Sequence, residues 1–448
     1  MELSFLKEEQ VVRAKIVRMV CALSVFVAGF CAFPQNVIRP SDMPDGFASG
    51  KGKSFGANGK KVVTVSDAAE FKKYVGKGGY VVYVDGMIDI TGGFMPEDGD
   101  DSTGKLSPLI KSVSRGECST WVEYREKLAS GMTAESDYLG KHCDNEAGGW
   151  QKALGEEWAK LTIVRVASGT TIIGADGNSG LIGADLLLRD VSNIAIRNMI
   201  LQDAIDPFPH HEQNDGFNAE NDCISIVDGA KIWIDHCTFR DNIIVGVEQL
   251  PKVRLKDGSV EKYQIYDGLC DIKGSSSNIT VSYCRIENHD KVMLWGSSDN
   301  EKFSGTRYIS LHHNYFLNCK QRLPLVRLSS VHIYNNYFDR TADSMFKSDG
   351  AIQTRSGSKI ISEGNLFGAG INYSVAGNGK NPGQLYERAN VDNSVNKKWQ
   401  GRYVAVDQPM FDIPYEYVLE DAASLAETIP ARAGAGKLPV ALPPPVKR

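Results

Sequence analysis

One short pattern recurs along the chain: a polar residue is followed two places later by a large apolar one, each time at the end of a β-prone run. The runs read IAIRNMI, IWIDHCTF, ITVSYCRI, ISLHHNYF, VHIYNNYF and IISEGNLF, and alternate apolar and polar residues as short strands do. Their variable spacing is typical of a solenoid whose coils keep their strands and differ in their loops. An all-β sandwich is the alternative. The pairs are Asn198/Ile200, Cys237/Phe239, Cys284/Ile286, Asn314/Phe316, Asn336/Phe338 and Asn365/Phe367.

In a parallel β-helix, equivalent residues of successive coils stack at about 4.8 Å, so buried Asn side chains can hydrogen-bond in a ladder. Cys237 and Cys284 replace two of these residues. At that spacing they could be bridged, but two stacked buried thiols are the favoured reading. Cys118 and Cys143 lie in a polar stretch and could form a disulfide in an oxidising compartment.

The ends of the chain differ from the repeats. Residues 1–32 contain basic residues followed by an apolar run too short to cross a bilayer, which indicates a signal peptide and a secreted protein, extracellular or periplasmic. The remainder, 33–448, is expected to be one domain. It begins with a strand, a helix and a strand that could cap the solenoid, carries a polar, partly helical insertion at about 96–160, and ends in a wrapping tail at about 368–448.

The charge of the chain limits its partners. The 448 residues carry a net charge of -5, which disfavours nucleic-acid binding. An acidic substrate remains compatible, because a small basic cluster can bind a polyanion on an otherwise acidic surface.

Three carboxylates stand beside the β-prone runs: Asp222 in ENDCISI, and Asp267 and Asp271 in YDGLCDIKG. Residues i and i+4 of an extended chain lie on one face, and a neighbouring coil can add Asp222. Oxygen ligands without His or Cys suit calcium rather than zinc. Solvated turn residues are the alternative.

Cations follow downstream: Lys291 in NHDKVMLWGSSD, and Arg322 and Arg327 in QRLPLVR. Two arginines five residues apart would point to opposite faces of a strand. Pro324, however, interrupts the backbone hydrogen bonding of the strand and can turn both side chains to the same face. Arg matches carboxylates with a planar fork of donors. Three cations facing three carboxylates suit a site that holds a metal and an anionic ligand, with surface salt bridges as the alternative.

Taken in order, these segments closely resemble the pectate lyase family of polysaccharide lyases over most of the chain after the leader. The resemblance rests on TTIIGADGNSGLIGADLLLRDVSNIAIRNMI, NDCISIVDGAKIWIDHCTF, YDGLCDIKGSSSNITVSYCRI, NHDKVMLWGSSD, YISLHHNYF and QRLPLVRLSSVHIYNNYF. It implies an all-β, right-handed parallel β-helix. It also implies calcium-dependent cleavage of α-1,4-polygalacturonate, that is de-esterified pectin, by β-elimination.

The resemblance assigns roles to the residues already singled out. Asp222, Asp267 and Asp271 match the primary calcium ligands, Lys291 and Arg327 match residues that bind the uronate carboxylate, and Arg322 matches the base that takes the C5 proton. A basic Arg322 must first be neutral, which predicts an alkaline pH optimum. The segment Trp233 to His236 matches a family signature read as structural support beside the cleft.

Alternatives remain within and beyond this fold. A pectin lyase would act on methylated polymer without calcium, a β-helix polygalacturonase would hydrolyse through carboxylates alone, and a non-catalytic polysaccharide-binding protein would use the fold without chemistry. The chain departs from the family in its two ladder cysteines and its insertion. Trp295 is expected either to stack on sugar or to sit in the core. A monomer is expected.

Overall fold

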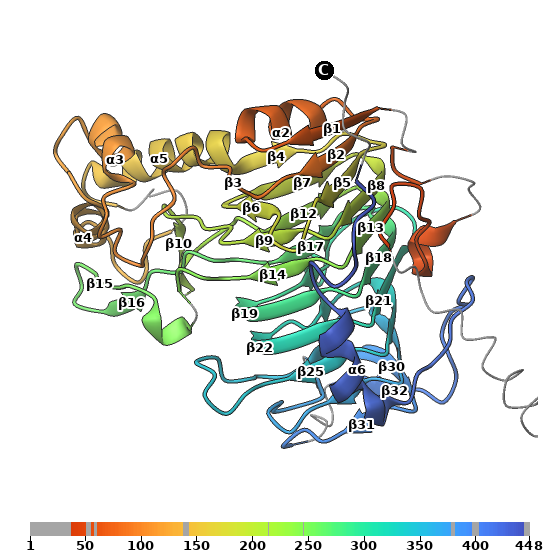
Figure 1. Ribbon diagram of the computed structural model, residues 1–448. Helices are drawn as coiled ribbons and strands as arrows, with labels where there is room; N and C mark the ends of the chain where they lie inside the picture. The colour runs from red at the N-terminus through yellow and green to blue at the C-terminus, as the bar shows by residue number, and fades with distance from the viewer. Residues whose placement is uncertain are drawn as a thin grey trace, which may run out of the picture. The chain divides into compact units, whose positions relative to one another are not determined.

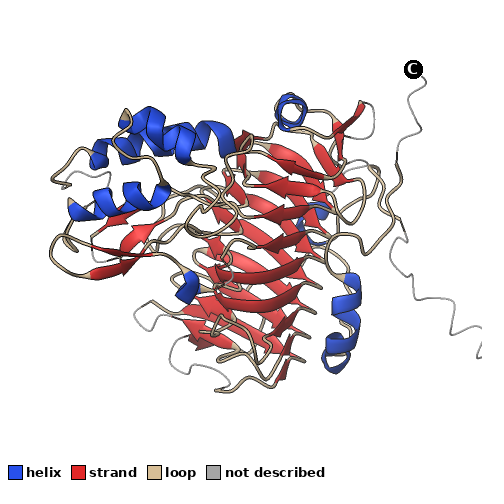
Figure 2. Ribbon diagram, turned by 60° about the vertical axis from the view of Figure 1, so that its left-hand side comes forward, coloured by secondary structure: helices blue, strands red, loops and turns tan. Residues whose placement is uncertain are grey.

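Three parallel β-sheets run the length of the protein, and the chain visits them in turn, once per coil (Figures 1 and 2). The computed structural model describes residues 37–50, 55–57, 61–137, 143–213, 215–244, 246–377, 381–396 and 403–442. The predicted leader, 1–32, therefore lies outside the described residues. Every element below belongs to one compact unit, Arg39–Arg448.

Sheet I is the longest of the three, with eleven strands in the described part of the chain. Its strands are β1 (Val62–Val65), β2 (Val81–Val84), β5 (Thr171–Gly174), β8 (Ser192–Arg197), β13 (Ala230–Asp235), β18 (Ser277–Ser282), β21 (Arg307–His312), β24 (Ser329–Tyr334), β27 (Lys359–Glu363), β30 (Gly383–Arg388) and β32 (Tyr403–Ala405).

Sheet II follows sheet I in each coil. Its described strands are β3 (Met87–Asp89), β6 (Gly180–Ile182), β9 (Ile200–Gln202), β14 (Thr238–Arg240), β19 (Arg285–Lys291), β22 (Tyr315–Gln321), β25 (Tyr337–Asp339), β28 (Leu366–Phe367) and β31 (Val391–Asp392).

Sheet III closes each coil before the chain returns to sheet I. Its described strands are β4 (Ile163–Arg165), β7 (Asp185–Arg189), β12 (Ile224–Val227), β17 (Cys270–Lys273), β20 (Leu294–Trp295), β23 (Leu325–Val326), β26 (Ile352–Thr354) and β29 (Val375–Gly377). The predicted all-β parallel β-helix is confirmed, and the strands extend past Phe367, where the sequence pattern had suggested that they end.

Rows of identical or similar side chains fill the interior, because in-register parallel strands place equivalent residues above one another. Phe316, Phe338 and Phe367 form one such row, with ring centroids 4.8 and 5.0 Å apart. Aliphatic residues of all three sheets complete a single continuous core.

The predicted asparagine ladder is present and longer than expected. Asn314, Asn336 and Asn365 each accept a hydrogen bond through Oδ1 from the backbone N–H of the preceding ladder residue, at 2.8, 3.0 and 2.9 Å. Asn390 adds a further step, since its Oδ1 accepts from Asn365 N at 2.8 Å. Buried amides that satisfy each other in this way fix the register of the coils.

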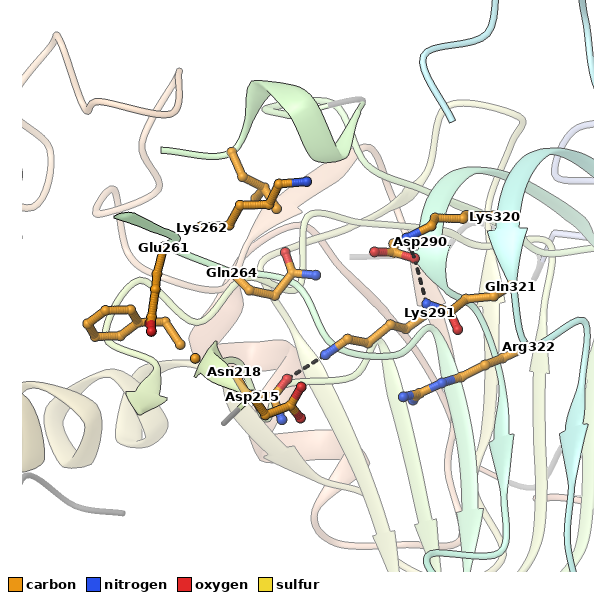
Figure 3. A pocket seen from close by; sticks show the side chains of 13 residues that line it. Asp215, Asn218, Glu261, Lys262, Gln264, Asp290, Lys291, Lys320, Gln321 and Arg322 are labelled. Atoms are coloured by element: carbon orange, nitrogen blue, oxygen red, sulfur yellow. Dashed lines mark hydrogen bonds and ion pairs between the residues drawn. The ribbon is translucent and has the colours of Figure 1, made fainter. Parts of the chain in front are cut away.

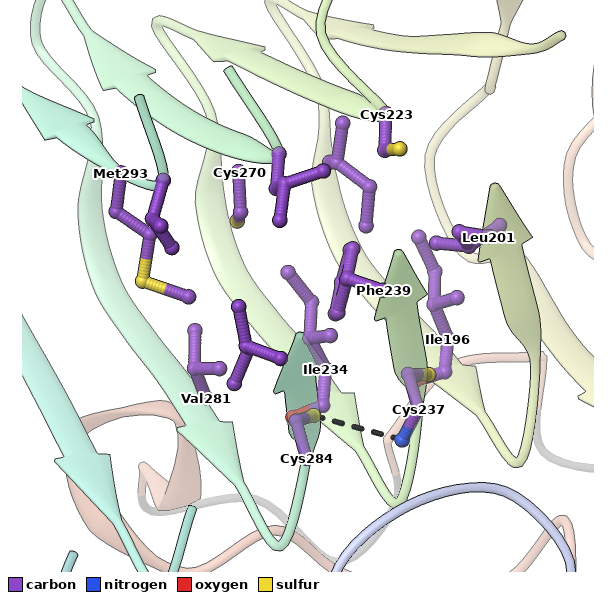
Figure 4. Close-up of a cluster of buried hydrophobic side chains, with 14 of the residues drawn as sticks. Ile196, Leu201, Cys223, Ile234, Cys237, Phe239, Cys270, Val281, Cys284 and Met293 are labelled. Atoms are coloured by element: carbon purple, nitrogen blue, oxygen red, sulfur yellow. Dashed lines mark hydrogen bonds between the residues drawn. The ribbon is translucent and has the colours of Figure 1, made fainter. Parts of the chain in front are cut away.

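At its N-terminal end the ladder continues into Cys284 and Cys237, which are stacked, unbridged thiols as predicted. Cys237 N donates to Cys284 Sγ at 3.4 Å, and both thiols are free (Figure 4). Cys118 and Cys143 are also free thiols, so the suggested disulfide between them is wrong for this structure.

Asn198 was assigned to the wrong row. Thr238 pairs with Ile200, so Met199 rather than Asn198 is the residue in register with Cys237. Asn198 instead has φ 55° and stands one place earlier, in the left-handed corner between sheets I and II, a conformation that Asn tolerates well. The polar–apolar pattern allowed this shift of one residue because Asn suits both positions.

Two segments cover the surface of the coils. The expected strand–helix–strand is β1, α2 (Ala68–Val75) and β2, and α2 buries Phe71 and Val75 at the first coil. The C-terminal segment, which holds η3 (Ala422–Ser424) and α6 (Leu425–Arg432), runs back along the solenoid until Ala441 O accepts from Tyr83 Oη at 2.6 Å.

A separate lobe projects from one side of the solenoid (Figure 1). It consists of α3 (Ser107–Ser114), α4 (Trp121–Ser130) and α5 (Ala147–Thr162), the hairpin of β10 (His210–Glu212) with β11 (Gly216–Asn218), and the hairpin of β15 (Lys252–Arg254) with β16 (Val260–Lys262). The lobe has its own apolar core, which includes Trp121, Trp158, Phe208 and Tyr263. The 3₁₀ turns η1 (Gly46–Ser49) and η2 (Val247–Gln249) complete the described elements.

None of the helices in the described part of the chain has both the length and the apolar character needed to cross a bilayer.

Asn336→Ala should destabilise the protein by at least about 2 kcal/mol, because it leaves the buried N–H of Asn314 without its acceptor. Urea unfolding of this variant and of Asn178→Ala, an exposed turn residue, provides the measurement. The exposed variant should stay within about 0.5 kcal/mol of the parent. Equal midpoints for the two variants would show that the ladder adds no stability.

Candidate active site

The predicted site residues gather where the strands of sheet II end and those of sheet III begin. Lys291 is the last residue of β19, and it is in register with Gln321, the last residue of β22. Arg322 follows directly. Asp271 lies in β17, and Asp222 comes two residues before β12. Parallel strands bring these equivalent ends to one edge, so distant segments of sequence meet there.

Asp222, Asp267 and Asp271 converge as predicted. Each offers a carboxylate oxygen, and the three oxygens lie within 4.8 Å of one another. Asp222 and Asp271 are fully buried, whereas Asp267 is half-buried. An all-oxygen group of this kind suits a hard cation such as Ca²⁺.

Backbone donors hold two of these carboxylates in place. Asp222 Oδ1 accepts from Gly268 N, and Asp271 Oδ1 accepts from Leu294 N, both at 2.9 Å. A Cβ added at Gly268 would lie 2.5 Å from the Oδ1 atoms of both aspartates, so only glycine permits this close approach.

His289 supports the third carboxylate from behind. Its Nε2 contacts the carbonyl oxygen of Asp267 at 2.9 Å, and its Nδ1 contacts Asp241 Oδ2 at 2.7 Å. A carbonyl only accepts, so Nε2 must donate. The buried His289 thereby fixes the backbone that carries Asp267.

Negative charge is in excess around the cluster. Asp271 Oδ2 is buried without a hydrogen-bond partner, and its ion pair with Lys273 Nζ is 3.4 Å long. Lys273 lies 3.7 Å from Asp222 Oδ2. A third buried carboxylate, Asp185 on the neighbouring strand β7, also has an oxygen without a hydrogen-bond partner among the described residues. A buried carboxylate requires a counter-charge, so the residues present fit a bound cation.

Burial governs how these carboxylates titrate. It raises the pKa of Asp185 to about 7. Burial and then Asp271 raise the pKa of Asp222, while Lys273 opposes the shift. Burial also raises the pKa of Asp271, again against Lys273. Protons and a metal ion would therefore compete for the same oxygens.

Lys291 connects the aspartates to an open groove. Its ammonium lies 3.3 Å from Asp267 Oδ1 and also donates to Asn218 Oδ1, on β11 of the lobe. The groove has a volume of about 610 Å³ and is lined on one side by Lys291, Lys320, Gln321 and Arg322 (Figure 3).

Arg322 has the geometry of a ligand-binding residue. It adopts φ 62°, which turns its side chain out of the alternation of the preceding strand. Its guanidinium makes no hydrogen bond or ion pair with the described residues, yet it is close enough to Asp271 to influence that carboxyl electrostatically. Its five N–H donors, which no residue in the described part of the chain accepts from, are available for an anionic ligand.

Arg327 lies close to Arg322 but outside the lining of the groove. Its Nε contacts Asp299 Oδ1 at 2.9 Å, and its Nη1 donates to Gly296 O at 2.9 Å. Burial lowers the pKa of Arg327, as do the neighbouring Arg355 and Arg322, while Asp299 opposes the shift. One edge of its guanidinium is thus anchored by protein.

The structure decides two further expectations. Trp295 is fully buried and donates through Nε1 to Cys270 O at 3.2 Å, so it belongs to the core and cannot stack on sugar. The Trp233–His236 segment consists of the end of β13 in sheet I and the corner residue that follows it, and Asp235 pairs with Arg197 at 2.8 Å. The side chains of this segment contact Ser282, Phe55 and one another on the outer face of sheet I, away from the strand ends that form the groove.

Sequence reasoning missed Lys273, Asn218, His289 and Asp299. Lys273 had a usable signal, since it follows Asp271 by two places in one strand and so shares its face. Asn218 had none, because it reaches the site from the lobe.

Comparison with known proteins places this geometry in a family. A family model described as pectate lyase matches residues 91–438. The chain is 34% identical to pectate lyase D of Dickeya chrysanthemi over 290 residues, which cover 61% of this chain and 72% of that protein. It is 31% identical to pectate lyase of Bacillus subtilis (strain 168) over 324 residues, which cover 69% and 71%.

Comparison with solved structures also finds pectate lyases. The solved structure of pectate lyase from Acidovorax avenae subsp citrulli superposes with a TM-score of 0.74 and 23% identity, and covers 92% of this chain and 99% of that one. The chain belongs to the pectate lyase family. The predictions of the family and of a lyase enzyme are confirmed.

Removing divalent metal should lower the thermal midpoint more at pH 8 than at pH 5. Asp185, Asp222 and Asp271 have raised pKa values, so near pH 5 they retain protons that the unfolded chain has released. Without metal their contribution to the free energy of unfolding falls as the pH rises from about 4 to about 7. Above that range only a cation can offset the buried charge.

The measurement is scanning calorimetry with calcium or chelator at each pH. Asp222→Asn should reduce the calcium-dependent difference at pH 8, and Asp257→Asn, in an exposed turn, should leave it unchanged. A difference that is equal at both pH values, or larger at pH 5, contradicts the assignment.

Proposed function

We propose that this protein cleaves polygalacturonate by β-elimination, with calcium held by Asp222, Asp267 and Asp271. The observation that carries the proposal is the contact from Asp267 through Lys291 to a groove that contains Arg322, whose guanidinium pairs with none of the described residues. The family of the chain supports it.

Substrate binding is assigned to the cations. Lys291 and Arg327 are proposed to bind uronate carboxylates, Lys291 from the groove and Arg327 through the edge of its guanidinium that Asp299 leaves free. Calcium at the three aspartates would bind the same carboxylate oxygens and neutralise charge that develops next to them.

Arg322 is proposed to take the C5 proton. That proton is α to a carboxylate and weakly acidic, so its removal is aided by cations that stabilise the enolate-like charge. The C4–O4 bond then breaks, its electrons leave with O4, and C4 and C5 become doubly bonded. A guanidinium must give up a proton before it can accept one, so the rate is expected to rise with pH above neutrality.

The other chemistries fit the site less well. Hydrolysis by paired carboxylates has no need of Arg322 and Lys291 in the groove. A lyase for methylated polymer has no need of three converging aspartates. We also propose that residues 1–32 direct export, that 33–448 act as one domain, and that the exported protein is a monomer, which gel filtration of the secreted form would test.

Arg322→Ala should lower kcat on polygalacturonate by at least about 100-fold, since a positioned base contributes about 10²–10⁴. Ultraviolet absorbance of the unsaturated product, recorded with calcium and with chelator, is the readout. Arg189→Ala, at the exposed end of β7, is the matched control and should retain full activity.

Three outcomes would contradict the proposal. Reducing ends without absorbance would indicate hydrolysis. Chelator-resistant activity on methylated pectin would indicate a pectin lyase. A folded Arg322→Ala variant with parental kcat would exclude Arg322 as the base.

A further inference from the structure

The groove has a second wall that the reaction described above does not use. One wall comes from the ends of β19 and β22, whereas the other comes from the lobe and includes Asn218, Lys262 and Gln264. Asn218 already contacts Lys291, so the lobe wall reaches the catalytic cations. Lys262 and Gln264 have no role in the proposed chemistry.

The lobe holds this wall rigidly. Tyr263, between the two residues, is fully buried in the lobe core, and its hydroxyl donates to Pro207 O at 3.1 Å. Its N–H donates to Pro251 O at 2.8 Å. Ile265 O accepts from Asp206 N, also at 2.8 Å. A segment anchored on both sides presents its side chains in a fixed geometry, which lowers the entropic cost of binding.

Alternation along this segment sends Lys262 and Gln264 to the face opposite Tyr263, toward the groove. Figure 3 shows the Gln264 amide between Lys262 and Lys291. Gln264 is half-buried and makes no hydrogen bond to the described residues. An amide with two donors and one acceptor oxygen that faces a groove is suited to sugar hydroxyls.

Lys262 can exchange its partner for substrate. Its ion pair with Glu248 is 3.3 Å long, and the side chains are 42% and 68% exposed. An exposed pair of this kind is worth little. Lys320 faces the same groove from the solenoid side, so cations stand on both walls beyond Lys291.

We propose that Lys262 and Gln264 form a substrate-positioning wall that binds galacturonate units next to the one being cleaved, Lys262 through a free carboxylate and Gln264 through sugar hydroxyls. This inference rests on the proposed function. It makes the lobe a determinant of specificity: the protein favours chains that are long enough to reach the wall and carry an unesterified unit there.

Binding is tested by titration calorimetry with de-esterified oligogalacturonides of increasing length, in an Arg322→Ala background, in which turnover is expected to be at least about 100-fold slower. The double variant Lys262→Gln, Gln264→Ala should bind long oligomers about 10-fold more weakly than its parent and short ones equally well. Lys252→Gln is the matched control, because Lys252 pairs with Lys262 across the hairpin, is exposed and lies outside the groove lining.

Kinetic measurements on protein that retains Arg322 distinguish an effect on substrate positioning from an effect on the chemical step. The double variant should raise KM for polygalacturonate about 10-fold and leave kcat within about 2-fold, the signature of lost uniform binding. Equal affinities for long oligomers in the variant and its parent overturn the inference, even if the protein is an active lyase. If the protein forms no unsaturated product, the proposed reaction fails, and the length-dependent affinity difference still decides the role of the wall.

Discussion

In-register stacking of parallel strands determines both the interior packing and the candidate site of this protein. Because equivalent residues of successive coils lie about 4.8 Å apart, any residue type that is placed at one position of a coil meets its counterparts above and below. Asn side chains so stacked satisfy one another, Phe rings stack face to face, and the corner between sheets I and II adopts the left-handed conformation in coil after coil. The interior is thus a set of rows, and the side chains within each row are of one chemical type.

The same rule creates the site. At the edge where sheet II passes into sheet III, stacking brings together buried carboxylates from β7, from β17 and from the residues just before β12, and it aligns Lys291 with the end of the next strand. Like charges at this spacing destabilise the fold unless something offsets them. Lys273 offsets only part of the charge, which leaves Asp271 Oδ2 and an oxygen of Asp185 without hydrogen-bond partners. We therefore interpret this edge as a cation site whose uncompensated carboxylates lower the stability of the metal-free fold.

Much of this arrangement could be predicted from the sequence, because rows leave a periodic signature. The Asn and Phe rows were predicted from this signature. The opening strand–helix–strand, the three aspartates and the cations were predicted from their local sequence, and the roles of the charged residues came from the family resemblance. Asn198 was shifted by one residue because a polar residue suits both the ladder and the corner. The strands after Phe367 were missed because β31 spans only two residues, and Asn390 is followed two places later by Asp392 rather than by a large apolar residue. The lobe wall carries no local signal, since hairpins distant in sequence bring Asn218 and Gln264 to the groove.

Direct measurement of calcium affinity tests the central claim, that three aspartates beside Lys291 and Arg322 hold the metal. Titration calorimetry should show one strong site in the parent protein. In Asp271→Asn, and in Gly268→Ala, whose added Cβ would crowd both buried carboxylates, that site should weaken by at least about 10-fold while the fold is retained. Asp257→Asn should bind as the parent does. Parental affinity in folded Asp271→Asn and Gly268→Ala would contradict the account.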